Sequence, residues 1–205
     1  MTWNPYWDEL KEEFPPFPSP DWVGGWKKGS EWYSRMMYYR YRYSFAIPSA
    51  EVVGAILPLG PIIELGAGSG YWAEVLGRAG ADVAAYDDGS WNYKRDKVWD
   101  RTWHEVHQGG PEDIAKENRP TLLLCWPDYD TPFAARCEQI HRESGGSWIA
   151  YVGEGEGGCT GDDEFHAALY KHWKVAKTIR IPQWMGLHDR LEIHERAHGA
   201  LRPGV

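Results

Sequence analysis

The residues with the clearest chemical potential are three glycines at alternating positions, Gly66, Gly68 and Gly70, preceded by the carboxylate Glu64. Glycines at this spacing let the main chain approach a ligand closely, because no side chain stands between the backbone and the bound group. A second carboxylate, Asp87, follows after roughly 20 residues, the separation at which nucleotide-binding folds place an acid against ribose hydroxyls. The pattern predicts a site for a nucleoside cofactor.

The elements around the glycines place them at the end of a buried strand. Residues 62–65 form a short apolar run typical of such a strand, and the residues after Gly70 have helical spacing. A helix that begins there turns its free N–H groups toward the ligand, which favours a polar or negatively charged group. Residues 81–86 predict a second strand, which Asp87 and Asp88 close.

The residue after the third glycine discriminates between cofactors. Dinucleotide sites need a small residue at the position of Tyr71, and tyrosine fits poorly there. The pattern instead resembles motif I of the class I S-adenosylmethionine-dependent methyltransferases. A nicotinamide enzyme, or a glycine turn that only packs a Rossmann-like core, are the alternatives. The resemblance implies that the methionine end of S-adenosyl-L-methionine is held by Glu64, Gly66, Ala67, Gly68 and Gly70, and its ribose by Asp87 with Asp88.

The resemblance also implies an adenine site after the third strand, which we expect at residues 103–106. In the family, this loop often carries an acidic residue followed by a small one, whereas Gly110 and Pro111 stand at those positions here. Glu112 or Asp113 would therefore supply any hydrogen bond to the adenine amine. Cys125 and Trp126, at the end of the next predicted strand, are also expected to border the cofactor.

The catalytic candidates are Asp128 and Tyr129, within the segment Trp-Pro-Asp-Tyr that begins at Trp126. This segment stands at the motif IV position, where nucleobase amino-methyltransferases carry an amide, acid or serine before two prolines and an aromatic residue. Trp126 departs from that pattern, so a nucleobase acceptor in nucleic acid is the alternative to a small molecule. Asp128 orients the nucleophile or accepts its proton, or else caps the following helix. Tyr129 either stacks on a flat substrate or packs.

Three residues are candidates for substrate binding: Tyr38, Trp126 and Glu154. Tyr38 belongs to an arginine-rich and tyrosine-rich helix predicted over residues 30–44, which either forms a lid over the pocket or has a solvated arginine face. Glu154 lies in a glycine-rich loop, where its charge suits an amine-bearing substrate or is simply solvated. A noncatalytic module that binds the cofactor is a further alternative to an enzyme.

No metal is expected. Methyl transfer from a sulfonium is a direct displacement that needs no metal ion. His194, Glu195 and His198 match the zinc-protease spelling His-Glu-x-x-His, but the alternating residues before them predict a strand rather than the helix that chemistry needs. The three cysteines, Cys125, Cys137 and Cys159, are too few and too irregularly spaced for a disulfide framework, and buried thiols are expected.

The whole sequence predicts an α/β fold with a Rossmann-like, seven-stranded, mostly parallel sheet, helices on both faces and a terminal antiparallel hairpin. Residues 1–50 are expected to form an aromatic, proline-rich arm, extended over residues 1–30, and the lid helix. Residues 51–205 form the methyltransferase-like domain. The net charge of −8 argues against general attraction to phosphate backbones. With neither a signal peptide nor a membrane-length apolar run, a cytoplasmic location is expected, and nothing selects an oligomeric state.

Overall fold

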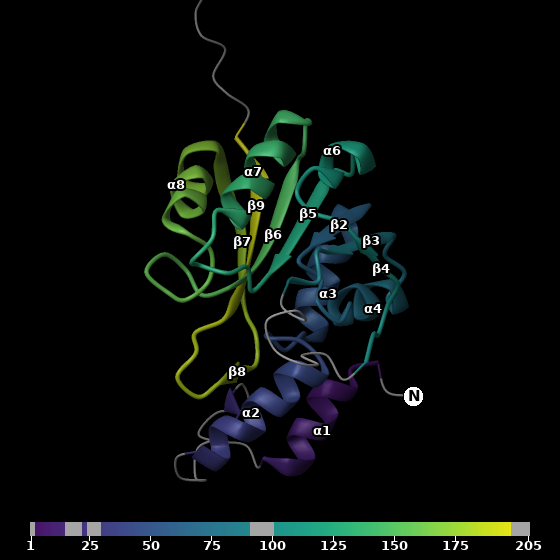
Figure 1. Ribbon diagram of the computed structural model, residues 1–205, viewed down its shortest axis with the longest axis vertical. Helices are drawn as coiled ribbons and strands as arrows, with labels where there is room; N and C mark the ends of the chain where they lie inside the picture. The colour runs from purple at the N-terminus through teal and green to yellow at the C-terminus, as the bar shows by residue number, and fades with distance from the viewer. Residues whose placement is uncertain (1–2, 15–21, 24–29, 91–100, 198–205) are drawn as a thin grey trace, which may run out of the picture.

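The computed structural model describes residues 3–14, 22–23, 30–90 and 101–197, and its centre is a seven-stranded sheet (Figure 1). The strand order is β4-β3-β2-β5-β6-β9-β7. Neighbouring strands from β4 to β6 are parallel, whereas β9 is antiparallel to both β6 and β7. The predicted sheet is confirmed. Its strands are β2 (Ile62–Leu65), β3 (Val83–Asp87), β4 (Val106–Gln108), β5 (Thr121–Cys125), β6 (Trp148–Gly153), β7 (Trp173–Arg180) and β9 (Arg190–Arg196).

Helices cover both faces of the sheet, as predicted. Successive strand residues point to opposite faces, so the adjacent isoleucines Ile62 and Ile63 enter different apolar cores. Ile62 packs with α3 (Ala50–Ile56) and α4 (Tyr71–Arg78). Ile63 packs with α6 (Asp113–Glu117), α7 (Phe133–Glu143) and α8 (Asp163–His172). A short 3₁₀ helix, η1 (Leu57–Leu59), joins α3 to the first strand of the sheet.

The N-terminal region contains a helix where extended chain is expected. α1 (Pro5–Glu13) begins with a proline, and the Asn4 side chain accepts a hydrogen bond from the Trp7 N–H at 3.2 Å. Tyr6 and Leu10, one helical turn apart, are fully buried in the core that contains Ile62. The prediction of an extended arm is therefore wrong for α1, because capping and tertiary packing outweigh the proline-rich composition nearby.

The second helix and a small two-stranded sheet complete this end of the molecule. α2 (Ser30–Arg42) confirms the helix predicted over residues 30–44. β1 (Trp22–Val23) pairs in parallel with β8 (Gln183–Trp184), which lies in the connection between β7 and β9. The Trp184 indole donates a hydrogen bond to the Tyr6 hydroxyl at 3.0 Å. The first helices are thus attached to the last strands, as Figure 1 shows for α1, α2 and β8.

Two element boundaries differ from the sequence prediction. The third strand begins at Val106 rather than at Trp103, because the Trp103 N–H donates to the Ser69 carbonyl and its indole N–H to the Arg42 carbonyl. α7 begins after Pro132 with no side-chain cap among the described residues, so Asp128 does not cap this helix. Within the described residues, no helix is long and apolar enough to cross a membrane.

Candidate functional site

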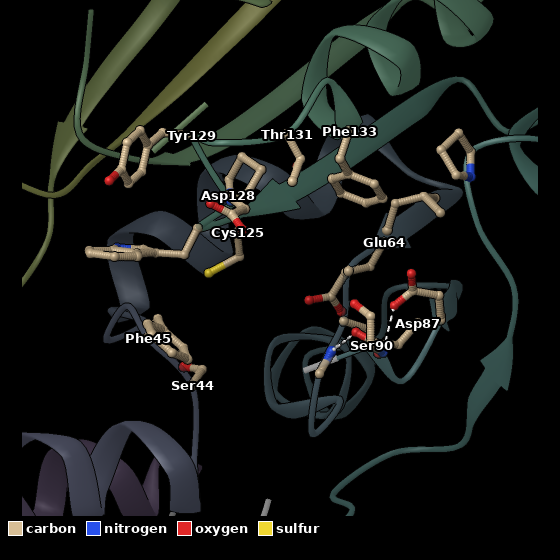
Figure 2. Close-up of a pocket in the computed structure, with 18 of the residues that line it drawn as sticks. Ser44, Phe45, Glu64, Asp87, Ser90, Cys125, Asp128, Tyr129, Thr131 and Phe133 are labelled. Carbon is tan, nitrogen blue, oxygen red and sulfur yellow. Dashed lines mark hydrogen bonds between the residues drawn. The ribbon is translucent and has the colours of Figure 1, made fainter. Parts of the chain in front are cut away.

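A cavity of about 670 Å³ opens where β2, β3 and β5 end (Figure 2). That volume is within the usual range for small-molecule pockets, roughly 300 to 1,000 Å³. One side carries the carboxylates Glu64 and Asp87 together with Ser90, and the other carries Phe45 and Tyr129. Of the predicted site residues, the cavity is lined by Glu64, Gly66, Ala67, Gly68, Asp87, Asp88, Pro111, Cys125, Trp126, Asp128 and Tyr129.

Asp87 is fixed against the glycine turn. Its Oδ2 accepts a hydrogen bond from the Gly68 N–H at 2.8 Å, and its Oδ1 accepts one from the Gly89 N–H at 2.7 Å. Gly70 has a left-handed φ of 75°, and a Cβ there would stand 2.8 Å from the side chain of Val106. Because the glycines have no side chains, the turn can pack against Val106 of β4 and approach the Asp87 carboxylate.

Glu64 is a buried carboxylate that has spare bonding capacity. Its side chain is 1 % exposed, and its Oε2 has no hydrogen-bond partner among the described residues. Burial raises the pKa of Glu64 to about 8, with a further contribution from the charge of Asp87 and an opposing one from the Ala73 N–H. An unpaired buried oxygen in a cavity fits a cationic partner such as an ammonium group.

The predicted adenine loop reaches the cavity through Pro111 and the preceding Gly109. The Asp113 carboxylate accepts a hydrogen bond from the Gly110 N–H at 2.9 Å and pairs with Lys116 at 2.7 Å, and these bonds lower its pKa. Glu112 pairs with Arg136 at 3.2 Å. Both carboxylates thus have protein partners, and a bond from either of them to adenine stays a prediction.

The opposite end of the cavity is built around Trp126. Its backbone is left-handed, with a φ of 56°, and its indole N–H donates to Oδ1 of Asp189 at 2.8 Å. Asp128 accepts a hydrogen bond from the Asp130 N–H at 3.1 Å, while Tyr129 is 52 % exposed. Asp128 therefore stabilises the turn before α7 and also faces the cavity. Its carboxylate and the Tyr129 ring lie where an acceptor could contact them.

Two predicted substrate residues do not line this cavity. Tyr38 is 40 % exposed and contacts the guanidinium of Arg35. Glu154 is buried rather than solvated, since it accepts hydrogen bonds from the backbone N–H groups of Cys159 at 3.1 Å and His188 at 2.8 Å. Its carboxylate joins two loops. Neither side chain is in a position to support the role first assigned to it.

The structure adds cavity residues beyond those assigned to the site from the sequence. Tyr43, Ser44 and Phe45 directly follow α2, and Phe133 begins α7. The aromatic run over residues 30–44 was a signal for this wall, but the residues after the helix, not Tyr38, reach the cavity. Cys159 also lines it.

The structure also shows where the three cysteines and the described residues of the His-Glu-x-x-His sequence lie. Cys137 is buried as expected, whereas Cys125 and Cys159 are partly exposed and line the cavity. His194 and Glu195 belong to β9, so the predicted strand is confirmed there, and His198 lies outside the described residues. No group of three His, Cys, Asp or Glu side chains in the described ranges could hold a metal ion.

Neither a family model nor a curated protein matches the chain. Solved structures do match. Magnesium protoporphyrin IX methyltransferase from Synechocystis PCC 6803 with bound SAH has 11 % identity, and the match covers 94 % of this chain and 94 % of that chain at a TM-score of 0.49. Ribosomal protein L11 methylase from Lactobacillus delbrueckii subsp. bulgaricus has 13 % identity, with 75 % and 82 % covered and a TM-score of 0.43. A protein in the NADB-Rossmann superfamily from Streptococcus agalactiae has 8 % identity, with 77 % and 73 % covered and a TM-score of 0.45.

The fold is identified by the order and direction of the strands. The parallel strands β4-β3-β2-β5-β6 are completed by the antiparallel β9 and then β7 at the edge. A glycine turn after the central strand β2 is followed by an acid at the end of its neighbour β3. With this topology, the chain has the fold of the class I S-adenosylmethionine-dependent methyltransferases.

Proposed function

We propose that this protein is an S-adenosylmethionine-dependent methyltransferase that acts on a small-molecule acceptor. The observation that carries the proposal is the pair of carboxylates in one cavity. Asp87 is fixed at the Gly68 N–H, and one buried oxygen of Glu64 has no hydrogen-bond partner within the part of the chain that the structure describes. A ribose diol and an ammonium group have the hydrogen-bond donors that these two carboxylates can accept.

Each part of the cofactor has candidate partners. Glu64 would accept the ammonium of the methionine part, and Asp87 with Asp88 would accept the ribose hydroxyls. Pro111 would pack against adenine, and Cys125 and Trp126 would border the transferred group. The turn residues that would approach the methionine part through their backbone are Gly66, Ala67 and Gly68, which line the cavity. Gly70 does not line it and instead lies close to Val106.

When bound, S-adenosylmethionine supplies an electrophilic methyl group on a sulfonium. The task of the protein is to align a nucleophile behind that methyl group and to exclude water. Phe45 and Trp126 would form the apolar wall against which the acceptor lies, with Tyr129 at the exposed side. Asp128 would orient the nucleophile and accept its proton.

Transfer of a labelled methyl group from S-adenosylmethionine to fractions of a cell extract tests the proposal. We expect label in the small-molecule fraction with the wild-type chain and at least about tenfold less label with Asp87→Ala at a limiting concentration of S-adenosylmethionine. Asp82→Ala is the matched control, because Asp82 lies just before the same strand and pairs on the surface with Arg119. Label in nucleic acid instead would favour the nucleobase alternative. Cofactor binding without transfer to any fraction would contradict an enzyme and favour a noncatalytic binder.

A further inference from the structure

The cavity has a strongly acidic lining. Of the described residues that line it, five carry a carboxyl group and one carries a guanidinium. The carboxyl groups are those of Glu64, Asp87, Asp88, Asp128 and Asp130. The guanidinium is that of Arg136, which pairs with the Glu112 carboxylate at 3.2 Å. A cavity with this lining attracts positively charged ligands and repels anions.

The cofactor of the proposed function would neutralise only part of this charge. S-adenosylmethionine carries a sulfonium, an ammonium and a carboxylate, so it brings one net positive charge. Its ammonium and its ribose are assigned to the end of the cavity that carries Glu64, Asp87 and Asp88. The carboxylates of Asp128 and Asp130 are left for the acceptor.

These two carboxylates lie on the aromatic side of the cavity. Figure 2 shows Asp128 and Tyr129 on the side that also carries Phe45, away from Asp87. The hydrogen bond that Asp128 accepts from the Asp130 N–H, at 3.1 Å, uses Oδ1 and leaves Oδ2 for a ligand. Carboxylates and aromatic faces both attract positive charge, so together they suit an organic ammonium group.

The charges behind the aromatic wall do not reverse this preference. The guanidinium carbon of Arg40 lies 4.2 Å from the ring centroid of Phe45 and 4.0 Å from that of Trp126, but Arg40 does not line the cavity. Arg40 interacts electrostatically with Asp189, which interacts in turn with Glu154. Two acids thus accompany the one guanidinium behind the wall.

We propose that the acceptor is a basic amine attached to a flat ring, and that Asp128, with Asp130 beside it, selects this amine. The inference rests on the proposed function, since it takes the cofactor to occupy the end that carries Glu64 and Asp87. The ring of the acceptor lies along Phe45 and Trp126, and its ammonium faces Asp128.

An ammonium has no electron pair to donate, so methylation requires that Asp128 first accept one proton from the bound nitrogen. Asp128 is partly exposed and can pass this proton to water. One nitrogen–carbon bond then forms from the freed nitrogen pair, and one carbon–sulfur bond breaks with its pair on sulfur. Overall, the ammonium and S-adenosylmethionine give the methylated ammonium, S-adenosylhomocysteine and one proton.

Three probes that share one ring system and differ in charge test this inference: 2-naphthylmethylamine, 2-naphthylmethanol and 2-naphthoate. Their binding to the full chain is measured by equilibrium dialysis at pH 7, with and without saturating S-adenosylhomocysteine. We expect the amine, which is an ammonium at this pH, to bind about tenfold or more tightly than the alcohol, and naphthoate to bind most weakly. Added salt should weaken binding of the amine and leave binding of the alcohol unchanged.

The double variant Asp128→Asn, Asp130→Asn should reduce the preference for the amine over the alcohol to about twofold or less. The amide at position 128 can still accept the backbone N–H that the carboxylate accepts in the wild type. Glu156→Gln is the matched control, because this exposed carboxylate lies in the loop after β6 and does not line the cavity. It should keep the wild-type preference.

The inference is overturned if the wild-type chain binds the alcohol or naphthoate as tightly as the amine, or does not bind the amine at all. An unchanged preference in the double variant, or binding of the amine that is insensitive to salt, also contradicts it. Failure of the wild-type chain to bind S-adenosylhomocysteine would instead contradict the proposed function, while the ranking of the three probes alone would still test the acidic lining.

Discussion

Asp87 and Glu64 face one cavity but differ in how their carboxylates are bonded. Asp87 accepts two backbone N–H groups, from Gly68 and Gly89, which hold its carboxylate in place. Glu64 is buried, and its Oε2 has no hydrogen-bond partner among the described residues, so its neutral form is favoured until a cation binds. At the scale of single residues, the cavity therefore combines a fixed negative charge with one that a ligand can induce.

Asp87→Ala should weaken binding of S-adenosylmethionine by about tenfold or more, since charge-assisted hydrogen bonds contribute roughly 1.5 to 3 kcal/mol each. The measurement is an isothermal titration of the folded variant beside the wild type and Asp82→Ala. Equal affinity in all three proteins would remove Asp87 from the ribose site.

Glu64→Gln should make stability less dependent on pH. The pKa of Glu64 is raised from 4.5 to about 8, so between these values the folded chain retains a proton that the unfolded chain releases. The free energy of unfolding therefore falls as pH rises through this window, by about 1.4 kcal/mol for each unit of pKa difference. Glutamine does not ionise, so the variant should not show this fall in the free energy of unfolding.

Urea unfolding of the wild type and Glu64→Gln at pH 5 and pH 8 measures this effect. The variant should gain stability relative to the wild type at the higher pH. A constant difference between the two proteins at both pH values would show that Glu64 does not hold the proton.

At the scale of elements, local patterns predicted the central β2-turn-α4-β3 unit because its signals are local. Alternating glycines, a short apolar run and helical spacing act within residues 62–87, and the structure follows them. α1 was missed because Tyr6 and Leu10 are buried by contacts distant in sequence, including the bond from Trp184. Glu154 was expected either at the substrate or in solvent, and its burial was missed for the same reason, since its partner His188 is contributed by the loop before β9.

The site residues also divide into those with local sequence signals and those brought together by contacts distant in sequence. Glu64 and Asp87 were found from spacing along one strand-turn-helix unit, and both line the cavity. Phe45 was not indicated as part of the site, and Arg40 was one of several arginines in the predicted lid helix. Only the packing of α2 against the turn at Trp126 brings Arg40 and Phe45 together with the Trp126 ring.

Leu10→Ala tests whether α1 is part of the core. Leu10 is fully buried, so its truncation should destabilise the protein by about 2 to 5 kcal/mol. Lys11→Ala is the control on the same helix, because Lys11 is exposed and its ion pair with Asp8 is worth little. Both are compared by denaturant unfolding. If Leu10→Ala were as stable as Lys11→Ala, α1 would be a detachable arm after all.

At the scale of the whole molecule, the N-terminal helices and the C-terminal strands together enclose the end of the cavity lined by Phe45 and Trp126. β1 pairs with β8, Arg40 of α2 stacks on Trp126, and Asp189 from the loop before β9 accepts the Trp126 indole N–H. The end that carries Glu64 and Asp87 is built separately, by the turn after β2 and the end of β3. One end of the cavity thus depends on the glycine pattern and the other on long-range packing.

The most direct test of this account is a calorimetric titration of the full chain with S-adenosylhomocysteine and, separately, with NADH. The account predicts one site per chain for S-adenosylhomocysteine, abolished or strongly weakened by Asp87→Ala, and no heat of binding for NADH. Binding of NADH without binding of S-adenosylhomocysteine would contradict it.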